Sequence, residues 1–395
     1  MAMEKSINER NLSILKIMFL FRFSADALFY NFLTRYFSSL GFSPLELGTL
    51  IAIIPFMSVV GNLSLSYLAT SKKKNIMLLI FWTVLESSFV FSYGCVSGFV
   101  YVLIFDIVCC FCSNSFYNLL DTFAMDISSK VGKTYSSIRL YGSLAYVIGT
   151  ALGGVVISNL SYKYDFMLSG ALLLISGAIF LFIKFDKNEL NNEFNENKKE
   201  KIKTSSLLKI KPYVFYMIFV VLMVGVNGST DNLYSIFTTA LKIPDDIFGY
   251  FSSATILMEC FAIVLCTAFS KKLNYFKMML IGTIALMLRL IIFSIPDMNS
   301  YAYLSTQLLR GITYGTYLSA HINIVLRLVG QRYLAKGIFV IAAVQQLFQA
   351  GINQVSPIIS KSTSYSLSFV ILLGVVYLSL IFFYISNKLF RSQVQ

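Results

Sequence analysis

Long apolar stretches separated by short polar ones run through the whole sequence. A membrane-spanning helix needs about 20 mostly apolar residues, and we find twelve stretches of roughly this length. They occupy residues 14–37, 45–69, 76–96, 99–125, 138–160, 164–184, 213–240, 247–270, 277–295, 300–328, 334–359 and 365–387. The first stretch contains Arg22 and Asp26 and lacks an obvious small-residue cleavage site, so we expect a membrane span there rather than a cleaved signal peptide.

The only long polar stretch divides the twelve spans into two sets of six. Its core reads KNELNNEFNENKKEKIK, which is rich in charge and asparagine and has almost no apolar residues. Such a composition is typical of a flexible linker. The sequence therefore predicts an all-α polytopic membrane protein with twelve transmembrane helices in two six-helix bundles, residues 1–184 and 213–395, joined by a linker at residues 185–212.

Composition agrees with this pattern and excludes other classes. Only 13% of the 395 residues are charged and 57% are hydrophobic, whereas soluble proteins carry roughly 25% charged residues. A soluble enzyme, a disordered protein and a secreted disulfide scaffold are therefore excluded. The formal net charge of +13 is compatible with nucleic-acid binding, so the location of the basic residues has to decide that question.

The basic residues gather on one side of the expected membrane. With twelve spans, both chain termini and the linker share a side. That side holds 23 of the 32 Lys and Arg residues, the opposite side holds 4, and the other 5 lie within or at the edges of the spans. Because cytoplasmic loops carry the excess of basic residues, we expect both termini in the cytoplasm and the protein in a bacterial-type cytoplasmic (inner) membrane. The charge then sets topology, and no nucleic-acid partner is expected.

Ten ionisable residues fall inside the apolar spans, where a charge costs at least ~2.5–3.5 kcal/mol and usually serves a function. They are Arg22, Asp26, Glu86, Asp106, Asp121, Arg139, Asp231, Glu259, Arg289 and Arg310. A structural alternative exists for some of them. Arg22 and Asp26 are four residues apart and can pair on their own helix, and Glu86 and Asp106 can form ion pairs between helices.

Helical spacing places several polar side chains on shared faces. Arg139, Gly142, Tyr146, Gly149 and Gly153 follow one another at 3, 4, 3 and 4 residues, and glycines on such a face let another helix approach closely. Other faces are formed by Asn114, Asn118 and Asp121, by Asn227, Asp231 and Tyr234, by Thr306, Arg310, Thr313, Tyr317 and His321, and by Gln346, Gln349 and Asn353. Polar faces on several helices need a shared wet interior. Their amides, carboxylates, guanidinium groups and rings suit a neutral, hydroxyl-rich solute.

Two six-helix bundles with a basic linker resemble the major facilitator superfamily, whose binding site lies between the halves at mid-membrane. The stretch from Asp121 through RLYGSLAY to Gly153 resembles the lactose permease group of oligosaccharide/proton symporters. This resemblance implies that Asp121 and Arg139 bind a sugar and that Tyr146 stacks on its ring. Asp121 replaces the group's usual Glu, and Tyr146 replaces its usual Trp.

The second half resembles the same group less completely. GYFSSATILMECF matches the stretch with the group's other sugar-binding glutamate, here Glu259, and the buried aspartate and arginine correspond to Asp231 and Arg289. Where the group carries the His and Glu that handle its proton, this chain has Arg310 and Thr313. Its helix 11 lysine is replaced by a glutamine, and the loop LSYLATSKKKN lacks the usual Asp. The binding part of the pattern is thus better kept than the coupling part.

We therefore expect an alternating-access transporter of a small polar solute, with a sugar first and proton symport as a further hypothesis. The expected substrate-binding residues are Asp121, Arg139, Tyr146, Asn118, Asn227 and Glu259. The candidates for proton coupling or ion pairing are Asp231, Glu259, Arg289 and Arg310. A symporter of nucleosides or other polar metabolites, an uncoupled facilitator and a nontransporting sensor remain alternatives, whereas a multidrug exporter would want fewer charges.

Neither catalysis nor a bound cofactor is expected. The chain has one histidine and neither an HExxH nor a GxSxG motif. Cys109, Cys110 and Cys112 are closely spaced, but one helix cannot direct three sulfurs at one metal, so we expect them to be packing residues. We expect His321 to be a hydrogen-bonded structural residue, and Tyr117 either to narrow the binding pocket or to pack between helices.

Overall fold

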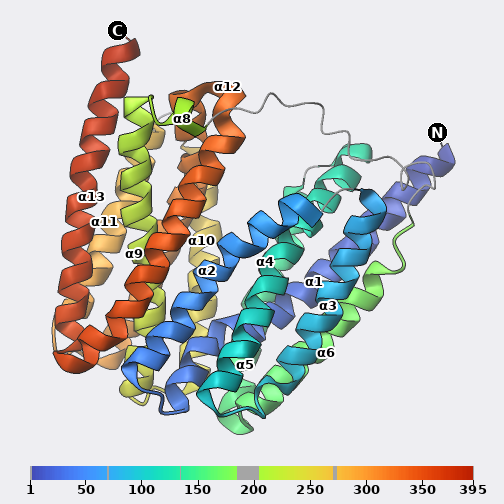
Figure 1. The fold of residues 1–395 in the computed structure, drawn as a ribbon, viewed down its shortest axis with the longest axis horizontal. Helices are drawn as coiled ribbons and strands as arrows, with labels where there is room; N and C mark the ends of the chain where they lie inside the picture. Colours follow the sequence, from blue (N-terminus) through green and yellow to red (C-terminus); the bar gives the residue numbers. More distant parts are fainter. Residues whose placement is uncertain (1, 69–70, 134, 185–203, 270–273, 395) are drawn as a thin grey trace. The chain divides into compact units, whose positions relative to one another are not determined.

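The computed structural model describes residues 2–68, 71–133, 135–184, 204–269 and 274–394, which fold into helices and contain no strand (Figure 1). The helices are α1 (Ala2–Ser39), α2 (Pro44–Leu68), α3 (Lys72–Tyr93), α4 (Phe99–Lys130), α5 (Ser136–Asn159), α6 (Tyr162–Phe180), α8 (Thr204–Leu207), α9 (Lys211–Ala240), α10 (Asp245–Ala268), α11 (Tyr275–Ser294), α12 (Ser300–Ser362) and α13 (Tyr365–Val394).

Helix α12 consists of two helical parts that meet at Gly330. This residue has φ 74° and ψ 169°, a left-handed backbone that only glycine adopts without strain. The two parts correspond to the expected spans at residues 300–328 and 334–359. With this division the prediction of an all-α polytopic protein with twelve membrane helices is confirmed.

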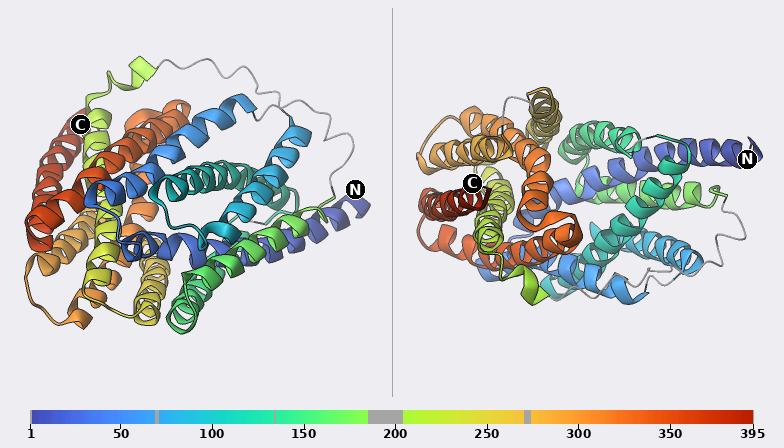
Figure 2. Two further views of the ribbon diagram at one scale, coloured as in Figure 1. Left: turned by 60° about the horizontal axis from the view of Figure 1, so that its bottom comes forward. Right: turned by 90° about the horizontal axis from the view of Figure 1, so that it is seen from above.

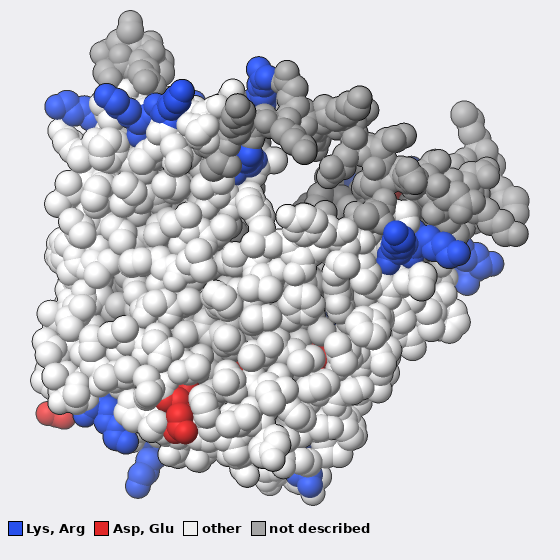
Figure 3. Space-filling model, in the orientation of Figure 1, with Lys and Arg blue, Asp and Glu red and all other residues white. Residues whose placement is uncertain are grey.

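Nine helices of the described chain are long and apolar enough to cross a membrane by length and composition. The long helices outside this set are α1 and α12, because they carry more polar and charged residues than the others. On the face shown in Figure 3, the described Lys and Arg side chains lie near the helix ends, and the surface between those ends is almost uncharged. This distribution suits a belt of lipid around the helices.

Several helices begin at a short polar sequence whose side chains cap the first turn. Ser43 precedes α2, and its hydroxyl and backbone N–H both donate to the Glu46 carboxylate at 2.7 and 2.9 Å. Pro44 takes the first helical position, where its missing N–H costs nothing. Asn274 and Asn299 cap α11 and α12 by accepting from the backbone N–H two residues on. These caps fix the helix starts within otherwise apolar sequence.

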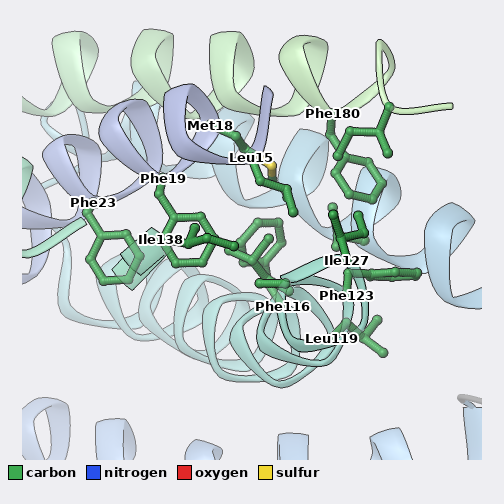
Figure 4. Close-up of a cluster of buried hydrophobic side chains, with 14 of the residues drawn as sticks. Leu15, Met18, Phe19, Phe23, Phe116, Leu119, Phe123, Ile127, Ile138 and Phe180 are labelled. Atoms are coloured by element: carbon green, nitrogen blue, oxygen red, sulfur yellow. The ribbon is translucent and has the colours of Figure 1, made fainter. Parts of the chain in front are cut away.

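One compact unit comprises Met1–Phe42, Phe56–Asn197 and Pro244–Ser253. In it α1 packs on α5 and α6, and α3 packs on α4 and α6. Its buried core includes Phe19 and Phe23 of α1, Phe116 of α4 and Ile138 of α5, whose side chains converge in Figure 4. The described part of this unit therefore has an apolar centre in which aliphatic side chains and aromatic rings pack together.

The second unit comprises Ser43–Pro55, Lys198–Ile243 and Ala254–Gln395. Here α9 packs on α12 and α13, and α11 packs on the same two helices, as the two further views in Figure 2 also show. Phe293 and Phe369 stack with ring centroids 4.6 Å apart. Asn353 donates to the Ile51 carbonyl at 2.8 Å, which fastens the first turns of α2 to this unit.

The expected linker differs from the structure at its end. Residues 185–203 of that linker lie outside the described residues. Thr204–Leu207 forms the short helix α8, and α9 begins at Lys211, so Lys211 and Pro212 belong to a helix. Proline is favoured in the first turn of a helix, which explains why this polar-looking segment is already helical. At the other end of the chain, α1 begins at Ala2 and extends the expected first span backwards.

Candidate functional site

Arg22 is the centre of a buried ion cluster in the first unit. Its two terminal nitrogens donate to the Glu86 carboxylate at 2.7 and 2.9 Å, and its Nε donates to Asp26 Oδ2 at 3.1 Å. The Ser113 hydroxyl accepts a further bond at 3.1 Å, and the guanidinium lies 4.2 Å from the centroid of the Phe116 ring. Arg22 and Glu86 are fully buried. The expected pairing of Arg22 with Asp26 is present, and Glu86 joins it from α3.

Asp121 and Arg139, the expected sugar-binding pair, face each other across α4 and α5. Arg139 Nη1 lies 4.0 Å from Asp121 Oδ1, and the two side chains are 43% and 33% exposed. Tyr135, at the start of α5, donates its hydroxyl to Asp121 Oδ1 at 2.5 Å. Burial and the neighbouring carboxylate raise the pKa of Tyr135 well above its ordinary value, so its phenol stays a donor. The pair is loose and accessible, unlike the cluster around Arg22.

The glycine face of α5 lies against α1, as its spacing predicts. A Cβ on Gly142 would meet the Phe23 ring at 2.8 Å, and one on Gly149 would meet the Ser24 carbonyl at 3.0 Å. This close approach brings the Phe23 ring within 4.5 Å of the Arg139 guanidinium. Tyr146, the expected stacking residue, is half-buried and packs against the aromatic core of the unit.

The second unit has an ion cluster of its own around Asp231 of α9. Arg289 of α11 donates to Asp231 Oδ1 at 2.7 Å, and Arg310 of α12 donates to Oδ2 at 3.0 Å. Arg289 is fully buried, and its Nε and Nη2 find no hydrogen-bond partner among the described residues. Glu259 of α10 lies close enough to Arg310 to act on it electrostatically. Asp231, Arg289 and Arg310 thus form one ion cluster, and Glu259 acts on Arg310 from outside it.

The other expected binding residues differ in their surroundings. Asn227 is buried, and its amide oxygen has no partner in the described chain. Gln345, at the position of the group's lysine, donates to Gln349 one turn later at 2.9 Å. The side chain of Asn118 lies outside the part of the chain that the structure describes.

His321 and Asp106 are buried polar residues, each with a hydrogen-bond partner. The His321 ring nitrogen Nδ1 lies 3.1 Å from the Tyr216 hydroxyl, the hydrogen-bonded arrangement expected for it. Asp106 is fully buried, with the Cys110 thiol as its hydrogen-bond partner at 3.4 Å. Among the described residues there is no group of three or more His, Cys, Asp or Glu side chains that could hold a metal ion.

Sequence reasoning missed Tyr135, Phe23 and Asp165. Tyr135 is four residues before Arg139, so the helical spacing that found Tyr146 would have found it if extended back past the helix start. Phe23 gives no signal, because its contact with Arg139 exists only once α1 and α5 pack together. Asp165, at the start of α6, is fully buried, and neither of its carboxylate oxygens has a hydrogen-bond partner in the described chain.

Comparison with known families identifies the chain. The family model described as "MFS_1 like family" matches residues 12–354. This protein belongs to that family. It is accordingly a transporter of the major facilitator superfamily, as its sequence suggests.

Solved structures agree on the fold of this MFS_1-like protein. A variant of the nucleoside transporter NupG shares 16% identity, covering 95% of this chain and 99% of that one, with a TM-score of 0.81. A bacterial homologue of the human lysosomal transporter Spinster gives 11% identity over 98% of both chains and a TM-score of 0.73. The xylose transporter XylE from E. coli gives 11% identity over 96% and 95%, with a TM-score of 0.70. Among curated proteins, none matches this chain.

Proposed function

We propose that this protein moves a small, hydroxyl-rich polar solute, with a sugar as the first candidate, by alternating access across a bacterial-type cytoplasmic membrane. Both termini would lie in the cytoplasm, as the distribution of basic residues predicts. The observation that carries the proposal is the pair of Asp121 and Arg139, which is loose and accessible.

This pair keeps most of its hydrogen-bonding capacity for a ligand. At 4.0 Å the Arg139–Asp121 contact is long for a hydrogen bond, whereas Arg22 donates to Glu86 twice at ordinary lengths. A guanidinium has five N–H donors and a carboxylate about four acceptor positions, so together they can bind several neighbouring hydroxyl groups. Closely paired Arg22 lacks that freedom and serves the fold.

Aromatic rings flank the pair. The Phe23 ring lies under the Arg139 guanidinium at 4.5 Å, and Tyr146 lies on the same face of α5 as Arg139, two turns further along. An apolar ring suits the C–H face of a sugar while the charged pair takes the hydroxyls. Asn118 keeps its proposed binding role from sequence, and Asn227 and Glu259 are the proposed contributions of the second half.

A nucleoside is the second candidate. NupG, a nucleoside transporter, has this fold, and a ribose offers the same kind of hydroxyl groups as a hexose. The aromatic side chains would then stack on a base. An uncoupled facilitator would use the same binding residues, with coupling absent.

Solute counterflow in proteoliposomes tests the proposal. The purified full-length protein is reconstituted and loaded with a panel of unlabelled sugars and nucleosides, and exchange of each labelled counterpart is followed. We expect saturable exchange for at least one member, and Arg139→Ala should remove it. Lys130→Ala is the matched control, because that surface lysine pairs with Asp126 at 3.3 Å on the outside of α4. Exchange that survives Arg139→Ala would contradict the proposed site.

A further inference from the structure

The buried cluster around Arg22 contains more acid than base. Arg22 faces two carboxyl groups, Asp26 and Glu86, and all three are at least 95% buried. If both acids were ionised, the cluster would hold a net negative charge inside an apolar bundle, where an uncompensated charge is very costly. One proton on the cluster removes that charge and leaves a neutral Arg22–carboxylate pair.

Hydrogen bonding indicates which acid holds the proton. Glu86 takes both terminal nitrogens of Arg22 and also accepts from the Tyr30 hydroxyl at 3.1 Å, so its two oxygens are fully engaged as a carboxylate. Asp26 accepts from Arg22 Nε and from the Tyr117 hydroxyl through one oxygen only. Its Oδ1 has no partner within the described residues although it is buried. A proton on Asp26 therefore fits the geometry best.

The surroundings of Asp26 allow both of its charge states. The charged and titratable groups that face it are Arg22 and Tyr30 from α1, Glu86 from α3, Tyr117 from α4 and Arg139 from α5. Helix α6 contacts this turn of α1 through the Ser169 hydroxyl, which donates to the Ala25 carbonyl at 2.8 Å. One guanidinium at 3.1 Å stabilises the ionised form, while burial and Glu86 favour the neutral form.

Two other buried acids of this unit lack a neighbouring cation that would stabilise the ionised form. Asp106 and Asp165 are fully buried, and in the described chain neither has a cation within ion-pair distance. Without a cation the ionised form of either acid has nothing to compensate its desolvation. Asp26 is the one acid of the three with a cation beside it.

We propose that Asp26 is the proton-binding site of the transport cycle, an inference that rests on the proposed function. Asp26 would bind one proton and release it to water. In the release step the O–H bond of Asp26 breaks, the electron pair stays on the carboxylate and the proton leaves. A chain of contacts leads from this site to the proposed substrate pair. Tyr117 bonds to Asp26, the rings of Tyr117 and Phe23 lie 5.3 Å apart, and Phe23 underlies Arg139.

The coupling follows from electrostatics. When Asp26 is neutral, Arg139 has Asp121 as its acidic neighbour and is available for solute. When Asp26 loses its proton, a new negative charge appears at the far end of the contact chain and competes for Arg139. Solute affinity and proton affinity then depend on each other, and by linkage the effect is reciprocal. Asp231, a sequence-based candidate for proton coupling or ion pairing, lies between two arginines.

Infrared spectroscopy of the full-length protein in lipid tests the proton site without a solute, since the proton is the probe. As the pH rises, we expect the wild type to lose a carboxylic-acid C=O band that Asp26→Asn lacks. Asp165→Asn, the matched control, should keep the titrating band that Asp26→Asn lacks. An unchanged titrating band in Asp26→Asn, or no such band in the wild type, would overturn the proposal.

Two further variants keep the test decisive if Asp26→Asn fails to fold. Asp26→Glu keeps the carboxyl group and should restore a titrating band at a shifted frequency. Tyr117→Phe removes a donor to the carboxylate, so the midpoint of titration should move to higher pH by about one unit. A Tyr117→Phe midpoint equal to that of the wild type would count against the site even if Asp26→Asn could not be purified.

Transport separates this proposal from the proposed function. With labelled lactose and uridine as probes, Asp26→Asn should keep counterflow and lose accumulation driven by an imposed pH difference. Accumulation that persists in Asp26→Asn overturns the proton site and leaves the transport function standing. If the wild type exchanges neither probe, the choice of solute fails, and the infrared titration alone decides the proton site.

Discussion

The two halves hold ion clusters with opposite ratios of charge. In the first, one arginine, Arg22, meets two acids; in the second, Asp231 meets two arginines, Arg289 and Arg310. A surplus carboxylate can be neutralised by a proton, whereas a guanidinium keeps its charge at every accessible pH. The first cluster can therefore change its charge state during a transport cycle, and the second is a fixed feature of its bundle.

Removal of Asp231 should have the largest effect, because it leaves two arginines without their shared carboxylate. We expect Asp231→Asn to lower the free energy of unfolding by about 3–5 kcal/mol, seen as a clear fall in Tm in detergent at every pH tested. Asp126→Asn is the control, since its contact with Lys130 is exposed and such pairs are worth at most ~1 kcal/mol. A wild-type Tm for Asp231→Asn would remove the contrast between the clusters.

Removal of Arg22 should be less damaging and should depend on pH. In Arg22→Met the two acids left behind can be neutralised by protons, which the unfolded chain would not bind near neutral pH. The folded state then binds more protons than the unfolded state, so its stability falls as pH rises and recovers as pH falls. We expect the Tm deficit to shrink between about pH 8 and pH 5. A deficit independent of pH would contradict the idea that this cluster takes up protons.

Removal of Arg139 should affect transport and leave stability almost unchanged. Its side chain is 43% exposed and only loosely paired, so Arg139→Ala leaves no buried charge behind. Loss of charge-assisted hydrogen bonds to a solute corresponds to roughly a 10- to 100-fold weaker affinity. Uptake and Tm measured on the same preparation check this. A large fall in Tm would mean that Arg139 is structural, like Arg22.

The cost of adding a side chain at a close helix contact should be similar in the two halves. A Cβ on Gly149 would meet the Ser24 carbonyl at 3.0 Å, and a Cβ on Gly315 would meet the Glu259 carbonyl at 2.7 Å. We expect Gly149→Val and Gly315→Val each to cost about 1–3 kcal/mol through overpacking. Gly374→Ala is the control, because its Cβ would have no neighbour within 4 Å. Equal Tm values for all three variants would refute the close helix contacts.

Features determined by neighbouring residues in the sequence could be predicted, whereas features that depend on how the helices pack could not. The apolar stretches and the Arg139–Gly153 face were predictable because helical period and span length are properties of consecutive residues. The pairing of Arg22 with Asp26 was predictable for the same reason. Arg22 and Glu86 are 64 residues apart, so their contact depends on how α1 and α3 pack, and no spacing rule contains that information.

In the second half, the sequence supplied the members of the cluster and left their arrangement open. Either arginine could have replaced the missing lysine beside Asp231, and the structure places both there. The proposed proton site at Asp26 could not be predicted from sequence, because it follows from counting charges that lie on two separate helices, α1 and α3. The unpaired Asp165 was missed because it lies beside the end of an apolar span and fits no polar face.

The pairing of Arg22 with Glu86 also bears on the order in which the chain enters its membrane. Helix α1 is synthesised before α3, yet it is among the least apolar of the long helices and carries a guanidinium whose bidentate partner lies on α3. An unpaired arginine is poorly tolerated in lipid. Helix α1 should therefore stay beside the insertion machinery until α3 has been made, and the two should then move into the bilayer together.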